Sequence, residues 1–155
     1  MEQLLPAEAD TERLGAALAL AAPGSAPRAL VVFLHGELGA GKTTLGRGLP
    51  RALGEAGTVR SPSYTLLEGY EAGGRRVLHL DLYRLNDASE VEALGLRDEL
   101  DAGSLLLIEW PERAPEALPP PDLEITLAIV GAGRGARVGA ASAEGAAWLA
   151  ATVAR

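Results

Sequence analysis

The sequence predicts an α/β fold with a mixed, partly parallel sheet flanked by helices. Two short apolar runs, residues 29–34 and 105–108, are typical of strands buried on both faces of a sheet. The first run leads directly into a glycine-rich loop and then into a helical segment that begins near Lys42. The chain has 155 residues, which is about the length of one domain, so we expect a single domain over residues 1–155.

The first helix has a clear beginning and end in the sequence. Asp10 or Thr11 is a suitable N-cap for a helix that runs to about residue 22, because apolar residues recur every three to four positions after it. Proline and glycine in residues 23–27 end this helix and form a loop before the first buried strand.

The second helix carries residues that disfavour a regular helix. It is expected from Lys42 to about Leu53 and contains Gly46, Gly48 and Pro50. Proline removes one backbone donor and crowds the carbonyl group of the residue four positions earlier. We therefore expect a kink or an early end of this helix near Gly48.

Turn signals divide the rest of the chain. A Gly-Gly turn at 71–74 separates two extended segments, 58–70 and 75–83, which predicts a hairpin. Serine and aspartate favour the starts of helices, and glycine favours their ends. The remaining expected elements are a short helix capped by Asp87 or Ser89 and ended by Gly95, a strand at 105–108, a proline-rich loop at 115–121, a hairpin of 123–130 and 137–141, and a last helix capped by Ser142.

The loop after the first strand carries the strongest chemical signal. Gly36 to Thr43 match G-x-x-x-x-G-K-[ST] between a strand and a helix, so we expect a P-loop NTPase-like domain. Lys42 is the only lysine among 14 basic residues, and a compact ammonium group fits among phosphate oxygens where a planar guanidinium group does not. The loop residues expected to bind a nucleotide are Glu37, Leu38, Gly39, Ala40, Gly41, Lys42, Thr43 and Thr44.

A P-loop needs an acid at the end of a neighbouring strand, where it holds Mg²⁺ or a water molecule. Glu109 follows the apolar run 105–108, and Asp81 follows a similar run. We expect Thr43 and Glu109 to bind Mg²⁺, and Asp81 to make a second contact to the metal shell or the catalytic water. Lys42, Asp81 and Glu109 are therefore the expected catalytic residues.

Two other features have two readings each. The hydroxyl groups of residues 61–65 can reach the γ-phosphate region as a switch-like segment, or form an ordinary Ser/Pro turn. Trp110 directly follows the second strand-end acid and is either a core residue or a contact near the site. His35 and His79 are the only histidines, and two isolated histidines are not a metal signature.

Composition narrows the classes of function. Without cysteine there is no disulfide framework, Cys-ligated zinc or thiol catalysis. We expect no signal peptide, no membrane span and a cytoplasmic protein, because the N-terminus lacks basic residues and the apolar runs are short. A net charge of −7 disfavours direct, tight binding of nucleic acid. The guanine-reading motif Asn-Lys-x-Asp needs a lysine, and the only lysine lies in the P-loop, so ATP is favoured over GTP.

Three functions fit these residues. The first is an ATPase that acts on a protein complex, which agrees with two strand-end acids and no recognisable acceptor pocket. The second is a small-molecule phosphotransferase with Arg75, Arg76 or Arg84 as a phosphate clamp. Such an enzyme usually needs an Arg-rich lid, and the loop at 131–135, far from the P-loop in the chain, carries one arginine. The third is a nucleotide-dependent switch, which differs from the first only by rate.

Four motifs occur together between residues 10 and 112: HGELGAGKTT at 35–44, VRSPSYTL at 59–66, HLDLYR at 79–84 and LLIEWP at 106–111. Their order and spacing resemble the TsaE family, small bacterial ATPases of the tRNA threonylcarbamoyladenosine pathway. The chain departs from the family pattern at two positions. Ser63 stands where the family usually has threonine, and Pro50 stands where a helix former is expected.

The resemblance implies a P-loop fold, ATP and Mg²⁺ as cofactors, and hydrolysis that is weak alone and stronger on a TsaB–TsaD pair. TsaD transfers the threonylcarbamoyl group to adenosine at position 37 of tRNAs that read ANN codons, so tRNA is contacted only indirectly. ATP turnover would reset that complex between cycles. By match, Thr43 and Glu109 take metal roles and Asp81 a catalytic one, while Thr11 and Trp110 become nucleotide contacts.

Overall fold

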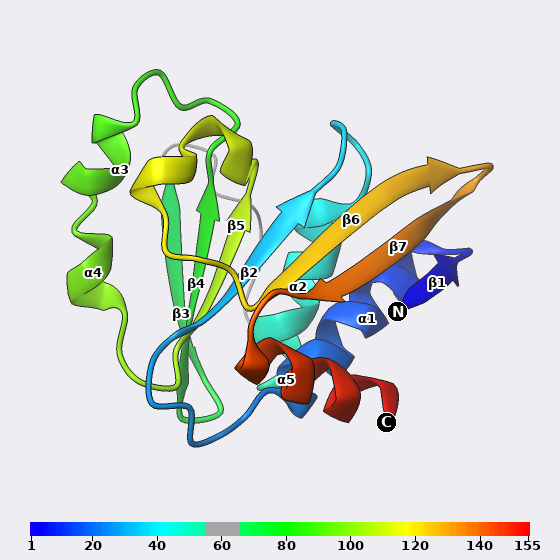
Figure 1. The fold of residues 1–155 in the computed structure, drawn as a ribbon. Helices are drawn as coiled ribbons and strands as arrows, with labels where there is room; N and C mark the ends of the chain where they lie inside the picture. Colours follow the sequence, from blue (N-terminus) through cyan, green and yellow to red (C-terminus); the bar gives the residue numbers. More distant parts are fainter. Residues whose placement is uncertain (55–65) are drawn as a thin grey trace.

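The computed structural model describes residues 1–54 and 66–155, which form one mixed sheet of seven strands with helices on both faces (Figure 1). The predicted α/β class with a partly parallel sheet is confirmed. Across the sheet, the strand order is β1-β7-β6-β2-β5-β4-β3. The strands are β1 (Glu2–Leu5), β2 (Leu30–His35), β3 (Leu67–Ala72), β4 (Arg75–Asp81), β5 (Leu105–Glu109), β6 (Leu123–Val130) and β7 (Gly133–Ala140).

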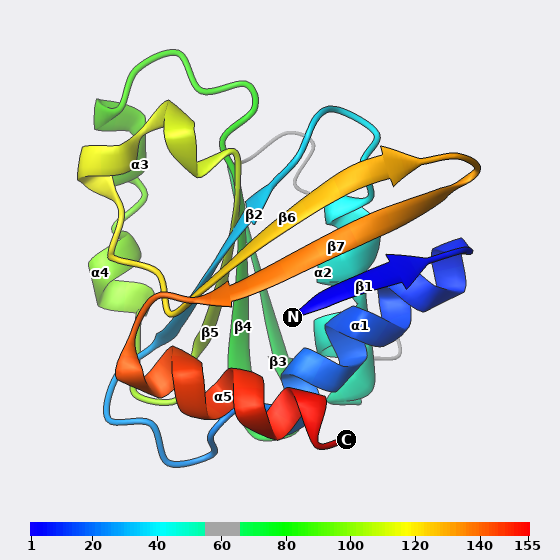
Figure 2. The same ribbon diagram turned by 45° about the vertical axis from the view of Figure 1, so that its right-hand side comes forward.

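The helices divide unequally between the two faces of the sheet. Helices α1, α2 and α5 pack on one face, whereas α3, α4 and two short 3-10 turns cover only the β2–β5–β4 side of the other face (Figures 1 and 2). Within the described residues, no helix is long and apolar enough to cross a bilayer. The bounds are α1 (Glu8–Ala21), α2 (Lys42–Ala52), α3 (Ser89–Ala93), α4 (Leu96–Glu99), α5 (Ala143–Val153), η1 (Pro111–Arg113) and η2 (Pro115–Ala117).

The centre of the sheet is parallel and its two flanks are antiparallel. Strand β2 pairs in parallel with β5 and β6, and β5 pairs in parallel with β4. In this register Glu109 lies between Leu34 of β2 and Asp81 of β4. Since the carboxyl ends of parallel strands meet at one edge of the sheet, the loop after β2 and both strand-end acids come together there.

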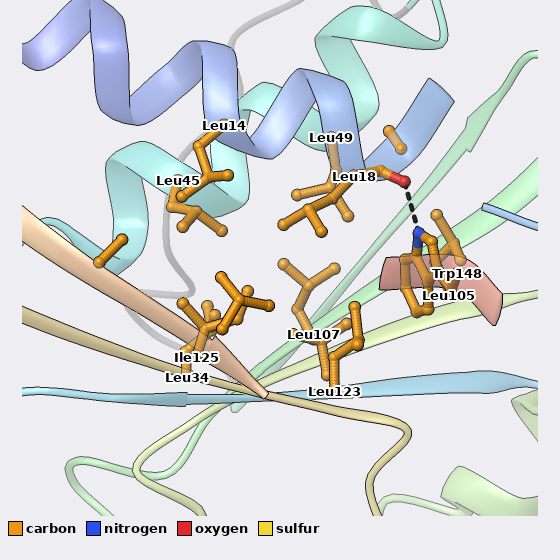
Figure 3. Packing of buried hydrophobic residues seen from close by; sticks show 14 of the residues in the cluster. Leu14, Leu18, Leu34, Leu45, Leu49, Leu105, Leu107, Leu123, Ile125 and Trp148 are labelled. Atoms are coloured by element: carbon orange, nitrogen blue, oxygen red, sulfur yellow. Dashed lines mark hydrogen bonds between the residues drawn. The ribbon is translucent and has the colours of Figure 1, made fainter. Parts of the chain in front are cut away.

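The main core lies between the sheet and helices α1 and α2 (Figure 3). Leucine side chains from both helices face leucine and isoleucine side chains of β2, β5 and β6. The one large aromatic group in this cluster, Trp148 of α5, is fully buried, and its indole N–H donates to the backbone oxygen of Leu18 at 2.8 Å. The labelled side chains are Leu14, Leu18, Leu34, Leu45, Leu49, Leu105, Leu107, Leu123, Ile125 and Trp148.

Helices α1 and α2 touch through their backbones. A Cβ atom added at Gly15 would clash with the backbone oxygen of Leu45, and one added at Gly48 would clash with the backbone oxygen of Glu12. Glycine is therefore required at both positions for steric reasons. Of the two expectations near Gly48, the early end is wrong, because the helix continues to Ala52 with its second half packed on α1. The kink stays a prediction.

Several predicted boundaries shift. Helix α1 begins at Glu8 instead of after Asp10 or Thr11, because the Asp10 carboxylate accepts from the backbone N–H of Ala7 at 2.8 Å from inside the first turn. Strand β7 begins at Gly133, earlier than expected, because the β6–β7 turn is tight. Strand β1 and helix α4 were not predicted at all.

Other elements are confirmed. Strands β3 and β4 form the expected hairpin, in which Ala72 pairs with Arg75 across the Gly-Gly turn. Gly95 ends α3 with a φ of 64°, a left-handed conformation that suits glycine. The Ser142 hydroxyl caps α5 by accepting from the backbone N–H of Gly145.

Candidate active site

A cavity of about 460 Å³ opens at the carboxyl edge of the parallel strands. Four parts of the chain form its wall: the glycine-rich loop with the start of α2, the ends of β4 and β5, the β1–α1 junction, and the β6–β7 hairpin. The lining residues are Leu5, Ala7, Glu8, Thr11, Leu38, Gly39, Ala40, Gly41, Lys42, Thr43, Thr44, Asp81, Tyr83, Glu109, Trp110, Ala132, Gly133 and Arg134.

The loop before α2 has the backbone shape that its glycines permit. Gly39 and Gly41 have φ angles of 84° and 104°, in the region that side chains with a Cβ rarely adopt. Gly36 faces the backbone oxygen of Leu127, which would lie 2.6 Å from an added Cβ. The loop ends at Gly41, the N-cap of α2, so the first N–H groups of an 11-residue helix face the cavity. A helix start of this kind favours anions such as phosphate groups.

Lys42 is held inside this loop. Its side chain is only 5% exposed, and its ammonium group donates to the backbone oxygens of Gly36 and Glu37, the latter at 3.1 Å. The nitrogen also lies 4.0 Å from the ring centre of Trp110, a cation–π distance. Burial lowers the pKa of Lys42, and the nearby carboxylates of Glu109 and Asp81 oppose that change.

The two strand-end acids lie in the same cavity as Lys42. Glu109 is 3% exposed, and its Oε2 lies 2.6 Å from Nε2 of His79, which is equally buried. Asp81 lies opposite Glu109 in the β4–β5 register, and its Oδ1 accepts from the backbone N–H of Tyr83 at 3.0 Å. The cavity therefore brings the ammonium group of Lys42 together with the carboxylates of both strand-end acids.

Trp110 lines the cavity and is at the same time partly buried against the second core cluster. Its φ of 59° is the only positive value for a non-glycine residue in the described part of the chain, and a bulky side chain adopts this conformation at a cost. The ring lies over Lys42 and against Tyr83, with 5.1 Å between the aromatic centres. The Arg113 guanidinium stacks near both rings, at 5.9 and 5.6 Å.

The remaining predicted residues differ in their placement. Thr11 is buried in the cavity wall, and its methyl group would lie 3.5 Å from a Cβ added at Gly41. Leu38, Gly39, Ala40 and Thr44 line the cavity directly. Glu37 contributes its backbone oxygen to Lys42. The predicted switch-like segment at 61–65 lies outside the described residues.

Two residues that sequence reasoning did not assign to the site are next to it. Arg134, in the hairpin that seemed far from the P-loop, donates to the backbone oxygen of Gly39 at 2.9 Å and to that of Gly133 at 2.8 Å. The hairpin is far from the P-loop in the chain, but parallel pairing of β2 with β6 brings it beside the loop. His79 was read as an isolated histidine, yet it bonds Glu109. Only the strand pairing reveals either contact.

The donor set fits Mg²⁺ if a nucleotide supplies further oxygens. Among residues 1–54 and 66–155, no group of three His, Asp or Glu side chains is arranged to hold a metal ion unaided. Thr43 and Glu109 offer a hydroxyl and a carboxylate oxygen in the cavity. Mg²⁺ prefers oxygen ligands and is commonly bound through one or two protein groups plus phosphates.

Comparison with known proteins shows the family to which the chain is similar. Residues 5–136 match the family model of the threonylcarbamoyl adenosine biosynthesis protein TsaE. The chain is 46% identical to a TsaE protein of Haemophilus influenzae over 100 residues, or 64% of this chain and 63% of that one. It is 40% identical to the Synechocystis protein of the same name over 120 residues, or 75% and 73% of the two chains. The match thus spans less than two thirds of the Haemophilus relative.

A solved structure has the same fold. The crystal structure of YdiB from Bacillus subtilis superposes with a TM-score of 0.81, covering 99% of this chain and 94% of that chain at 24% sequence identity. The family model covers most of the chain, including all four parts of the cavity wall. We conclude that the chain belongs to the TsaE family.

Proposed function

We propose that this protein binds ATP with Mg²⁺ in the cavity and hydrolyses it. The observation that carries the proposal is the position of Lys42, which lies at the start of α2 in one cavity with Glu109 and Asp81. A buried cation, a helix N-terminus and two carboxylates are the parts that phosphoryl transfer to water needs.

Each residue has a role in this reaction. The backbone N–H groups at the start of α2 bind the β-phosphate, and Lys42 moves from the carbonyl oxygens of Gly36 and Glu37 to the phosphate oxygens. Thr43 and Glu109, together with phosphate oxygens, would hold Mg²⁺, which would neutralise charge on the transferred group. Glu109 and Asp81 orient the attacking water. Thr11 and Trp110 contact the nucleotide from the cavity wall.

We further propose that ATP turnover serves tRNA threonylcarbamoyladenosine formation through a TsaB–TsaD pair, in the cytoplasm. Weak turnover by the isolated protein and stronger turnover on the pair follow from the family resemblance. The net charge of −7 supports indirect contact with tRNA, since an acidic protein is repelled by phosphate backbones.

Phosphotransfer to a small molecule is the alternative that Arg134 favours. Its guanidinium group lies on the cavity wall, where an arginine from a mobile lid would act in a kinase. Release of free phosphate from ATP in the absence of any acceptor supports hydrolysis. Turnover only when an acceptor metabolite is added would replace the ATPase proposal with the kinase one.

The substitution Glu109→Ala tests the role of the strand-end acid. We expect turnover to fall about 100-fold, because a group that acts in the transition state is lost, while ATP affinity changes little. Phosphate release and displacement of a fluorescent ATP analogue measure the two quantities separately. If ATP affinity collapses while turnover per bound nucleotide holds, Glu109 serves only to hold the metal or the structure.

A further inference from the structure

His79 and Glu109 form a buried polar pair on neighbouring strands below the cavity. Both side chains are almost completely buried, at 2% and 3% exposure, and Nε2 of His79 lies 2.6 Å from Oε2 of Glu109. An ionised carboxylate only accepts hydrogen bonds, so the bond to an ionised Glu109 requires the tautomer of His79 that carries a proton on Nε2. A bond of this length between buried groups fixes the orientation of both side chains.

Helix α2 passes close to the imidazole ring of His79 at Gly46. A Cβ added at Gly46 would lie 3.2 Å from Cε1 of His79 and 3.6 Å from its Nδ1. The contact at 3.2 Å is tighter than Cβ atoms normally make, so glycine lets the helix pass over the ring. Gly46 lies one turn after Thr43, which places the ring between the phosphate-binding helix and the acid of β5.

The strand register explains why the ring reaches Glu109. His79 lies opposite Leu107, and Asp81 lies opposite Glu109, in the parallel β4–β5 pair. Side chains two residues apart share one face of a strand. His79 and Asp81 therefore face the α2 side together with Glu109. The ring of His79 lies opposite Leu107, two residues before Glu109, and contacts the acid from there.

We propose that His79 is a positioning residue for Glu109, an inference that rests on the proposed ATPase function. Glutamate has three side-chain torsions, and the bond from Nε2 selects one arrangement of the carboxylate. Groups that hold a metal-binding or catalytic side chain in place typically change activity 10- to 100-fold when they are removed. His79 is not among the residues that line the cavity, and its side chain reaches the site through Glu109.

Two substitutions at this position separate the hydrogen bond from the volume of the ring. His79→Leu introduces a side chain of similar volume that has no hydrogen-bond donor. His79→Gln restores an N–H group near the position of Nε2. We expect His79→Leu to lower turnover about 10- to 100-fold with less than about a threefold change in ATP affinity. His79→Gln should recover a large part of that loss. Equal turnover in the leucine variant and the wild type would overturn the proposal.

A double-mutant cycle with Glu109→Ala tests whether His79 acts through the acid. In single-turnover measurements, adding His79→Leu to Glu109→Ala should cause no further loss, because the group it positions is absent. Fully multiplicative losses would mean that the histidine acts elsewhere, and the proposal would fail.

The wild type and Lys42→Ala are measured in the same assay. If the wild type does not hydrolyse ATP, the proposed function fails, whereas an active wild type with an unaffected His79→Leu variant refutes only the positioning role. If His79→Leu does not fold, Gly46→Ala replaces it, since a methyl group there displaces the ring while neither His79 nor Glu109 is substituted. Turnover should then fall about tenfold, and unchanged turnover would contradict the proposal.

Discussion

At the residue scale, the surroundings of Lys42 restrict which side chain can occupy this position. Its ammonium group is enclosed by the carbonyl oxygens of Gly36 and Glu37 and by the ring of Trp110. This space suits a compact cation, and the rest of the chain uses arginine throughout. The P-loop motif was sufficient to predict that Lys42 lies in this loop, because the pattern implies a local backbone shape that needs no long-range contact.

The substitution Lys42→Arg tests directly whether only a compact cation fits this space. We expect turnover to fall about 100-fold although the charge is kept, because the larger guanidinium group cannot occupy the enclosed space without moving the loop. The matched control is Arg137→Lys, the reverse exchange at an exposed site on β7 that pairs with Glu2. A fully active Lys42→Arg variant would mean that the single lysine reflects composition alone.

Arg134 is the opposite case, a residue that only the fold brings to the site. Its guanidinium group supports the backbone oxygen of Gly39 and adds positive charge to the cavity wall. We expect Arg134→Ala to weaken ATP binding about tenfold, the effect of one lost charge-assisted hydrogen bond. Displacement of a fluorescent nucleotide measures this. Arg137→Ala, three residues along the same strand, is the control, and equal affinities of the two variants would exclude a role for Arg134.

At the element scale, the predictable parts have strong local signals. The buried strands β2 and β5, the β3–β4 hairpin and the Ser142 cap of α5 were all expected from short patterns. Strand β1 was missed because its four residues, Glu2–Leu5, form a strand only by pairing with β7 at the edge of the sheet. Long-range pairing leaves no signal in so short a segment.

The contact between α1 and α2 gives a prediction at this scale. Gly15→Ala should lower the free energy of unfolding by roughly 3 kcal/mol, because the added methyl group would clash with the backbone oxygen of Leu45. Urea denaturation with an unchanged slope measures the loss. Gly24→Ala is the matched control, since nothing lies within 4 Å of a Cβ at that position. Equal stability of both variants would contradict the close helix contact.

At the scale of the whole molecule, the two ends of the parallel strands differ in what they carry. The cavity lies at the carboxyl ends of the strands. At their amino ends lies a buried acid, Asp122, that is hydrogen-bonded to groups of neighbouring elements. Asp122 accepts from Arg28 at 2.6 and 2.9 Å, from the backbone N–H of Val31 at 2.8 Å and from the Ser142 hydroxyl at 2.6 Å. These bonds join the start of β2, the start of β6 and the cap of α5.

This network predicts a dependence of stability on pH. Burial alone would raise the pKa of Asp122, but the hydrogen bonds from Arg28, Ser142 and Val31 outweigh it and lower the pKa below 3.8. The stabilisation is therefore present above the unfolded-state pKa and is lost as pH falls through the lower folded-state value. Asp122→Asn should cost about 2 kcal/mol at neutral pH and progressively less as the pH falls below the unfolded-state pKa and through the lower folded-state pKa.

Denaturation at a series of pH values tests the Asp122 prediction. The control is Glu116→Gln, which removes an exposed carboxylate and should leave the profile unchanged. A difference between Asp122→Asn and the wild type that stays constant down to acidic pH would show that ionisation of Asp122 does not contribute.

The site as a whole was partly predictable. The P-loop and both strand-end acids follow from local patterns, and the parallel register then places them in one cavity. Arg134 and His79 could not be assigned, because their partners are 95 and 30 residues away in the chain. The segment at 61–65 stays a prediction.

The measurement that tests the central claim most directly is ATP turnover of the purified protein, alone and with a TsaB–TsaD pair from the same source. The account predicts weak turnover alone and strong stimulation by the pair, both abolished in Lys42→Ala. Absence of stimulation, together with transfer of phosphate to a metabolite, would contradict it and establish a kinase instead.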